Sequence, residues 1–132
     1  MIFVDTSFWV AVIAARDAHH DEAIALLRAH ADDSMITSNH VRGETWTFLR
    51  RRYGHDAAIR FLDRLERTSR TRVERVGEKE EADAERWLRR HDERPFSWVD
   101  GTSFALMRAL RIKRALTFDA DFTAAGFEVL RA

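Results

Sequence analysis

The sequence predicts an α/β fold in which a mainly parallel sheet of four or five strands lies between two layers of helices. Short apolar runs alternate along the chain with longer segments that have one apolar face, which is typical of βα units. Acidic residues directly follow the first and the fourth of the short runs that predict strands. At 132 residues the chain has the length of one domain, and we expect residues 1–132 to form a single three-layer α/β/α domain.

The chain opens on a strand and a buried helix. Residues 1–4 are apolar and partly β-branched, which is typical of a short buried strand. Residues 8–15 form a second apolar run that is too long for a typical strand and rich in alanine, so it predicts a helix. Asp5 lies between them, where it can cap the helix or bind a ligand at the carboxyl edge of the sheet.

The remaining elements are predicted from their hydrophobic periods. Runs of three to five mostly apolar or alternating residues predict strands, at residues 35–37, 72–76, 114–118 and 127–130. Apolar residues at helical spacing, flanked by capping residues, predict helices, at residues 23–27, 38–54, 57–65, 78–91 and 97–107, with a helical turn at 123–126. The second and third of these helices form an expected αα-hairpin.

Composition places the chain among ordinary soluble proteins. Hydrophobic residues make up 45% and charged residues 33%, and the absence of cysteine excludes disulfides and thiolate zinc sites. No segment has the length of a membrane span or the character of a signal peptide, so we expect no membrane association and a cytoplasmic location. The net charge is zero, but residues 42–75 carry ten basic and five acidic residues. The arginine-rich 50–75 region is either a solvated face or a rim for nucleic-acid phosphates, and both interpretations stay open.

Two acidic residues fall on helical faces that should be apolar. At about 100° per residue, Glu44 shares a stripe with Val41 and Phe48, so we expect it to point toward the core. A buried carboxylate must be paired with a cationic side chain, protonated or bound to a cation. Asp100 also lies on a mostly apolar stripe, although Ser97 and Asp100 fit a capping box as well.

Carboxylates that meet at one edge of the sheet predict a metal site. Asp5 and Asp119 follow strands whose carboxyl ends lie on the same edge, and Glu44 and Asp100 are expected to point inward beside them. Four converging carboxylates repel one another unless cations neutralise them. Oxygen ligands without histidine or cysteine select Mg²⁺ or Mn²⁺, which suit phosphoryl chemistry.

Two other features carry no function in this interpretation. His19 and His20 are adjacent and do not share a helical face, so we interpret them as surface residues at the start of a helix rather than as metal ligands. The five glycines form no phosphate-binding loop.

Together these residues resemble the PIN-domain family and, more narrowly, its VapC-type toxins. The resemblance covers essentially the whole chain, and the motifs that carry it are Asp5-Thr6-Ser7, Glu44, Asp100, Thr117-Phe118-Asp119, Asp121-Phe122 and Gly126-Phe127. It implies a metal-dependent endoribonuclease that hydrolyses RNA with metal-activated water. By this resemblance the metal ligands, for one or two Mg²⁺ or Mn²⁺ ions, are Asp5, Glu44, Asp100 and Asp119.

The resemblance also implies roles for neighbouring residues and for partners. Thr6 or Ser7 would steady a metal-bound water or a ligand, and Asp121 would be an additional acid outside the ligand set. Gly101 stands where relatives commonly have alanine, which is expected to loosen the start of its helix. The family further implies a homodimer and a cognate antitoxin protein that blocks the site.

Three alternatives stand beside an RNA-cleaving toxin. A PIN-domain nuclease of RNA maturation would share the site but would have no neighbouring antitoxin. A receiver-like regulatory domain would also bind Mg²⁺, but it needs a pair of acids after the first strand, where this chain has Asp5 alone. A non-catalytic module that binds only RNA or protein would tolerate replacement of the four acids.

Overall fold

The structure, a computed structural model, describes residues 1–132 and contains one sheet of five strands. The strands are β1 (Ile2–Val4), β2 (Met35–Ser38), β3 (Thr71–Glu74), β4 (Arg114–Leu116) and β5 (Glu128–Val129). Their order is β3-β2-β1-β4-β5, and every neighbouring pair is parallel. The predicted parallel sheet is confirmed, and each strand begins within one residue of its expected position.

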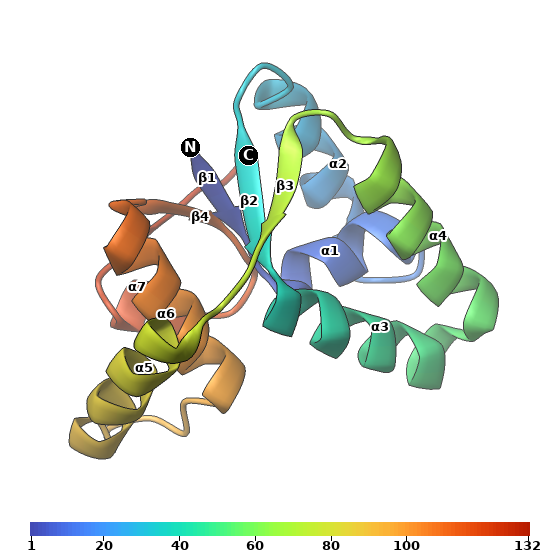
Figure 1. The fold of residues 1–132 in the computed structure, drawn as a ribbon. Helices are drawn as coiled ribbons and strands as arrows, with labels where there is room; N and C mark the ends of the chain where they lie inside the picture. The colour runs from blue at the N-terminus through green and yellow to red at the C-terminus, as the bar shows by residue number, and fades with distance from the viewer.

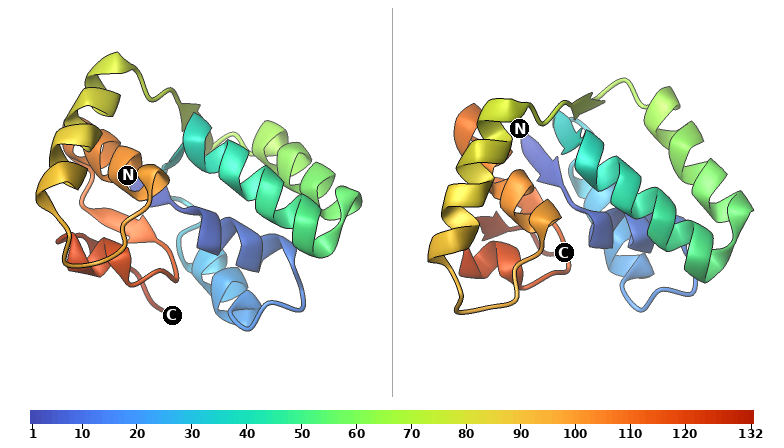
Figure 2. Two further views of the ribbon diagram at one scale, coloured as in Figure 1. Left: turned by 90° about the horizontal axis from the view of Figure 1, so that it is seen from below. Right: turned by 60° about the horizontal axis from the view of Figure 1, so that its bottom comes forward.

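Helices cover both faces of this sheet. They are α1 (Thr6–Ile13), α2 (His20–Ala29), α3 (Asn39–Tyr53), α4 (His55–Arg67), α5 (Glu78–Arg90), α6 (Trp98–Leu110) and α7 (Asp121–Ala124). Because crossovers between parallel strands are right-handed, α1–α4 lie on one face, and α5–α7, which lead back across the sheet, lie on the other (Figure 1). Figure 2 shows α3 and α4 side by side as the expected hairpin. None of the helices combines the length and the apolar composition needed to cross a membrane.

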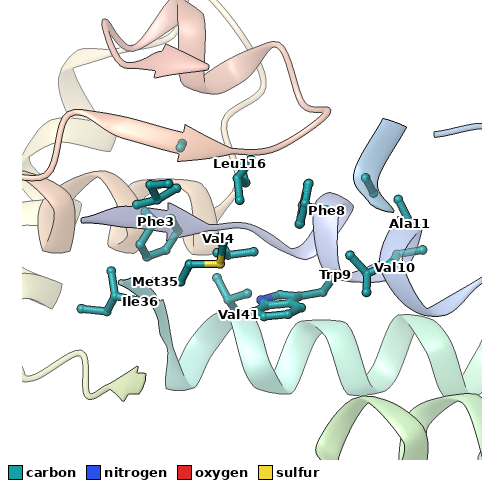
Figure 3. Packing of buried hydrophobic residues seen from close by; sticks show 14 of the residues in the cluster. Phe3, Val4, Phe8, Trp9, Val10, Ala11, Met35, Ile36, Val41 and Leu116 are labelled. Atoms are coloured by element: carbon teal, nitrogen blue, oxygen red, sulfur yellow. The ribbon is translucent and has the colours of Figure 1, made fainter. Parts of the chain in front are cut away.

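The core is built around β1 and α1. Phe3, Val4 and Phe8 have no exposed surface, and Trp9 is 2% exposed. Figure 3 places Trp9 beside Val41 of α3, in the layer between the sheet and the helical hairpin. Because α1 is covered on almost every side, its sequence is apolar from Phe8 to Ile13 rather than striped.

The strand order brings the carboxyl ends of β1 and β4 next to each other. The chain leaves β1 toward β2 on one side and returns to β4 on the other, which makes the space between β1 and β4 a topological switch point. Ligands of open α/β sheets bind at such points. The backbone N–H of Asp5 donates to the carbonyl of Leu116 at 3.1 Å, so the two edge acids that follow β1 and β4 start from adjoining backbone.

Gly101 has a packing role that the sequence did not indicate. A methyl group at this position would lie 2.7 Å from Cδ1 of Leu88, because α5 and α6 pack closely here. The glycine therefore lets α6 approach α5, and any loosening of the helix start is offset by this contact.

Replacing Gly101 is expected to have opposite effects in two backgrounds. Gly101→Ala alone should lower the free energy of unfolding by about 1 kcal/mol, since overpacking of about 1–3 kcal/mol exceeds the helix-propensity gain of about 1 kcal/mol. In a Leu88→Ala background the same change should raise it by about 1 kcal/mol. Urea unfolding measures both. Gly43→Ala in α3, where no atom lies within 4 Å of the added methyl group, is the matched control and should be stabilising. Additive effects of the Gly101 and Leu88 changes would contradict the packing argument.

Candidate active site

A cavity of about 550 Å³ opens at the carboxyl ends of β1 and β4. Six carboxylates line it, and no lysine or arginine does; the six are Asp5, Asp17, Glu44, Asp100, Asp119 and Asp121. The structure thus brings together all four acids that the sequence selected, although they lie as much as 114 positions apart in the chain.

Asp5 is 4% exposed and is anchored through one carboxylate oxygen. Its Oδ2 accepts hydrogen bonds from Thr117 Oγ1 (2.9 Å) and from Ser7 Oγ (3.1 Å), and a longer one from Ser7 N (3.5 Å). Asp5 therefore caps α1 and also faces the cavity, so the two sequence-based interpretations are compatible. Burial raises the pKa of Asp5 to about 6 against the effect of these donors, and the charge of Glu44 raises it further.

Asp100, Asp119 and Asp121 form a tight cluster in which one oxygen of each lies within 4.8 Å of the others. Asp100 also completes the predicted capping box: its Oδ2 accepts from Ser97 N, and Ser97 Oγ accepts from Asp100 N, both at 3.0 Å. The box occupies one carboxylate oxygen and leaves Asp100 in the cluster. Burial raises the pKa of Asp100 to about 7, with a further contribution from the charge of Asp119. Burial likewise raises the pKa of Asp119.

Asp121 lies inside this cluster, closer to the other acids than the sequence indicated. Its backbone N–H donates to Asp119 Oδ1 at 2.9 Å, because Asp119 turns the chain into α7. Its own Oδ1 accepts from Arg94 Nε at 2.6 Å. Arg94 is the one arginine that forms an ion pair with the cluster.

Glu44 does not face the core, so that expectation is wrong. The buried row of α3 is Val41, Thr45 and Leu49, whereas Glu44 and Phe48 stand one position away and are exposed. The alternative of pairing with a cationic side chain is wrong as well, because no cationic group lies within 4.0 Å of Glu44. Instead Thr6 Oγ1 donates to Glu44 Oε1 at 2.5 Å, and the carboxylate lines the acid cavity.

Sequence reasoning gave no site role to Asp17 and His19, which line this cavity, or to Thr117, which contacts two of its acids. Thr117 is 1% exposed, and its hydroxyl donates to Asp5 and accepts from Asp119 N at 3.0 Å, so it joins two acids from different strands. The position of Thr117, a hydroxyl residue close to a strand end and to Asp119, was a usable signal for this role. Thr6 lies in a similar position beside Asp5. His19 lines the cavity and stacks on Phe118, although nothing in its local sequence indicated this position.

Removing the Thr117 hydroxyl is expected to disturb the site more than the fold. Thr117→Val keeps the shape but deprives Asp5 of a donor and Asp119 N of an acceptor, which should cost about 1–3 kcal/mol of stability. Cleavage of RNA, the activity that the resemblance implies, should fall about 10- to 100-fold, since residues that orient the expected metal ligands have effects of this size. Thr45→Val is the matched control: Thr45 is equally buried, and its hydroxyl donates only to Val41 O within α3. Equal losses of activity in both variants would contradict this role for Thr117.

Comparison with known proteins identifies the family. The family model of the PIN domain matches residues 2–128. This chain belongs to the PIN-domain family. The PIN domain is 51% identical over 131 residues to the 23S rRNA-specific endonuclease VapC20 of Mycobacterium tuberculosis, in strains CDC 1551 / Oshkosh and ATCC 25618 / H37Rv. The match covers 99% of this chain and 98% of each relative.

Solved structures agree with this assignment. The PIN domain superposes on the crystal structure of M. tuberculosis VapC20, described as a sarcin–ricin loop cleaving toxin, with a TM-score of 0.93, 50% identity and full coverage of both chains. It also matches FitAcB from Neisseria gonorrhoeae with a TM-score of 0.68 over 98% of this chain and 96% of that one, a likeness at 18% identity that shows the fold alone. The predicted family, fold and function class are therefore confirmed: this PIN domain is an endoribonuclease of the VapC type.

Proposed function

We propose that this PIN domain is the toxin of a toxin–antitoxin pair, acting as one domain that hydrolyses RNA with Mg²⁺ or Mn²⁺. The observation that carries the proposal is the convergence of six carboxylates on one cavity that no lysine or arginine lines. Such a cavity repels an RNA phosphate unless a cation lies between them. Because the similar VapC20 is described as specific for 23S rRNA and as cleaving the sarcin–ricin loop, we propose the same loop as the substrate.

The residues present fit a divalent cation. Asp100, Asp119 and Asp121 each offer an oxygen within 4.8 Å of the others, and carboxylate oxygens are the hard ligands that Mg²⁺ and Mn²⁺ prefer. The raised pKa values of Asp5 and Asp100 reflect first the burial of their carboxylates and, to a lesser extent, the charges of neighbouring acids, and a bound cation would offset both costs. Transferring the family's ligands by position, we assign the metal to Asp5, Glu44, Asp100 and Asp119, with Asp121 completing the cluster.

Hydroxyl groups of this chain orient the proposed ligands. Ser7 and Thr117 hold Asp5, and Thr6 holds Glu44. These donors fix each carboxylate by one oxygen, which leaves the other available to a metal. When bound, the divalent ion supplies an activated water and offsets negative charge on the leaving oxygen. The protein's contribution is to fix the acids at the switch point, so that the phosphodiester has one position relative to them.

Cleavage of a defined RNA tests this proposal. The substrate is a stem-loop with the 23S rRNA sarcin–ricin sequence, incubated with purified protein and Mg²⁺ or Mn²⁺, and the products are mapped on a sequencing gel. We expect a cut in the loop that EDTA abolishes and excess Mn²⁺ restores. Calorimetry with Mn²⁺ alone accompanies the assay. Protein that binds Mn²⁺ but cuts neither the stem-loop nor total RNA would contradict the catalytic proposal and favour a binding module.

We further propose that the toxin forms a homodimer and is inhibited by a cognate antitoxin. Phe48 and Trp98 are 43% and 46% exposed and line a wide groove between α3 and α6, beside Arg51 and Glu81. Large exposed aromatic side chains next to charges of both signs are typical of protein interfaces. Sedimentation should therefore show a dimer, and Phe48→Ser with Trp98→Ser should shift it to monomer. A monomeric wild-type protein would contradict the dimer without touching the proposed chemistry.

A further inference from the structure

A histidine ring lies flat against an aromatic ring at the rim of the acid cavity. His19 stacks on Phe118 with ring centroids 4.3 Å apart and ring planes at 7°, and both residues line the cavity. Phe118 is half-buried and lies near-parallel to the fully buried Phe8, with centroids 5.8 Å apart and planes at 16°. The exposed imidazole therefore rests on an aromatic support that extends from the core.

The loop between α1 and α2 holds His19 in this position. Asp17 Oδ1 accepts from His19 N at 2.8 Å, and the Asp17 carbonyl accepts from His20 N at 3.1 Å. Asp17 N in turn donates to the Ala14 carbonyl at 3.0 Å, and His20 Nδ1 lies 2.7 Å from the Ala11 carbonyl oxygen. A loop with this many internal hydrogen bonds is preorganised, so a ligand that contacts the ring loses little affinity to ordering it.

We infer that the outward face of His19 is a stacking site for one unpaired base of the RNA substrate, next to the phosphate that is cut. Proteins recognise RNA loops by stacking splayed bases on aromatic side chains, histidine included. Such contacts suit a wall crowded with carboxylates, because a base is uncharged and every base has a π face. This role rests on the proposed ribonuclease function and adds to it a residue that selects the substrate by its unpaired base.

Substitutions at His19 test the stacking role. His19→Ala should lower kcat/KM on the sarcin–ricin stem-loop about 10- to 100-fold, mainly through KM, whereas His19→Phe, which keeps a flat ring, should stay within about threefold. The matched control is His91→Ala. His91 also stacks on an aromatic ring, that of Trp87 at 4.1 Å and 23°, but it does not line the cavity, so kcat/KM should not change. Equal losses in His19→Phe and His19→Ala would overturn the inference.

Abasic substrates separate base stacking from a structural effect. Stem-loops that lack one loop base at a time are cleaved by the wild-type protein and by His19→Ala. At the stacked position, loss of the base should slow the wild-type protein about tenfold or more and the variant far less, because the same contact is already absent. Identical losses in both proteins at every position would overturn the inference.

Two further outcomes separate a failure of the proposed ribonuclease function from a failure of the stacking role of His19. If the wild-type protein cuts no RNA with Mn²⁺, the proposed function fails, and the stacking site is then tested by binding alone. In that case 2-aminopurine in the loop should be quenched by the wild-type protein and not by His19→Ala, and equal quenching would overturn the inference. Unchanged cleavage by His19→Ala together with weakened antitoxin binding would also overturn it, because the ring would then serve the protein partner.

Discussion

Asp100→Asn is expected to lower kcat for RNA cleavage by a factor of about a thousand or more and to stabilise the metal-free protein at the same time. Loss of one carboxylate from the cluster removes several kcal/mol of transition-state stabilisation, and each 1.4 kcal/mol is about tenfold in rate. The fold gains because burial raises the pKa of Asp100 to about 7, so the wild-type protein at pH 8 carries a buried charge that the amide lacks. The gain in free energy of unfolding should be about 1–2 kcal/mol, since water at the cavity mouth screens part of the cost.

The capping box should survive the Asp100→Asn change, so the effects on activity and on stability can be measured separately. The side-chain amide that replaces the Asp100 carboxylate still offers an oxygen to Ser97 N, so the start of α6 keeps its hydrogen bond. Single-turnover cleavage measures the first effect, and urea unfolding in EDTA measures the second. Asp92→Asn, in an exposed loop outside the cavity, is the control and should change neither. Loss of activity together with loss of stability would show that Asp100 acts as a structural cap and not as a metal ligand.

The metal-free protein is expected to lose stability as the pH rises from about 4 to 8. The pKa values of Asp5 and Asp100 are about 6 and about 7 in the folded protein against an ordinary value of 3.8. Below 3.8 both states hold these protons. Between 3.8 and 7 the unfolded chain releases them first, so the free energy of unfolding falls with pH, and the loss is complete above the folded pKa values. A shift of about two units for Asp5 alone corresponds to about 3 kcal/mol as an upper bound.

A divalent cation should reverse this trend. Mn²⁺ binds the ionised carboxylates, so its stabilising effect grows with pH and reaches about 2.7 kcal/mol at one hundred times its dissociation constant. Thermal unfolding at pH 5, 6, 7 and 8, with EDTA or with Mn²⁺, measures both slopes. In Asp100→Asn the fall with pH in EDTA should be shallower, because the Asp100 contribution is removed and only those of Asp5 and Asp119 remain. A melting temperature that rises from pH 5 to 8 in EDTA would contradict the prediction.

The fold was predictable from local signals. The inner strands β1, β2 and β4 are buried and mostly apolar, whereas the edge strands β3 and β5 are partly exposed and mix apolar with charged residues, so each of the five strands left a signal in the sequence. Right-handed crossovers then decide which helices cover which face. Asp5 and Asp119 were identified for the same reason: each follows a strand, and the carboxyl ends of parallel strands share one edge.

Other features of the site depended on contacts that no local period encodes. Glu44 and Asp100 were selected as acids on apolar faces, and both line the cavity, but the stated reason holds only for Asp100. The direction of Glu44 depends on how α3 is rotated about its axis, which its packing against α1 decides. The requirement for a glycine at position 101 depends on close contact with Leu88, which belongs to a different helix.

The sequence by itself determined the order of the elements, the parallel sheet and four of the six acids of the cavity, because hydrophobic period and strand-end position are local properties of the chain. Only the tertiary structure decided that Asp121 joins the acid cluster, that Thr117 links Asp5 to Asp119, and that His19 lies over Phe118. The hydrogen bond from Phe118 N to Ser7 Oγ spans 111 positions. Contacts between residues so far apart form only when β1 and β4 pair. The free energy of that pairing depends on the whole folded chain, so no local segment of the sequence predicts these contacts.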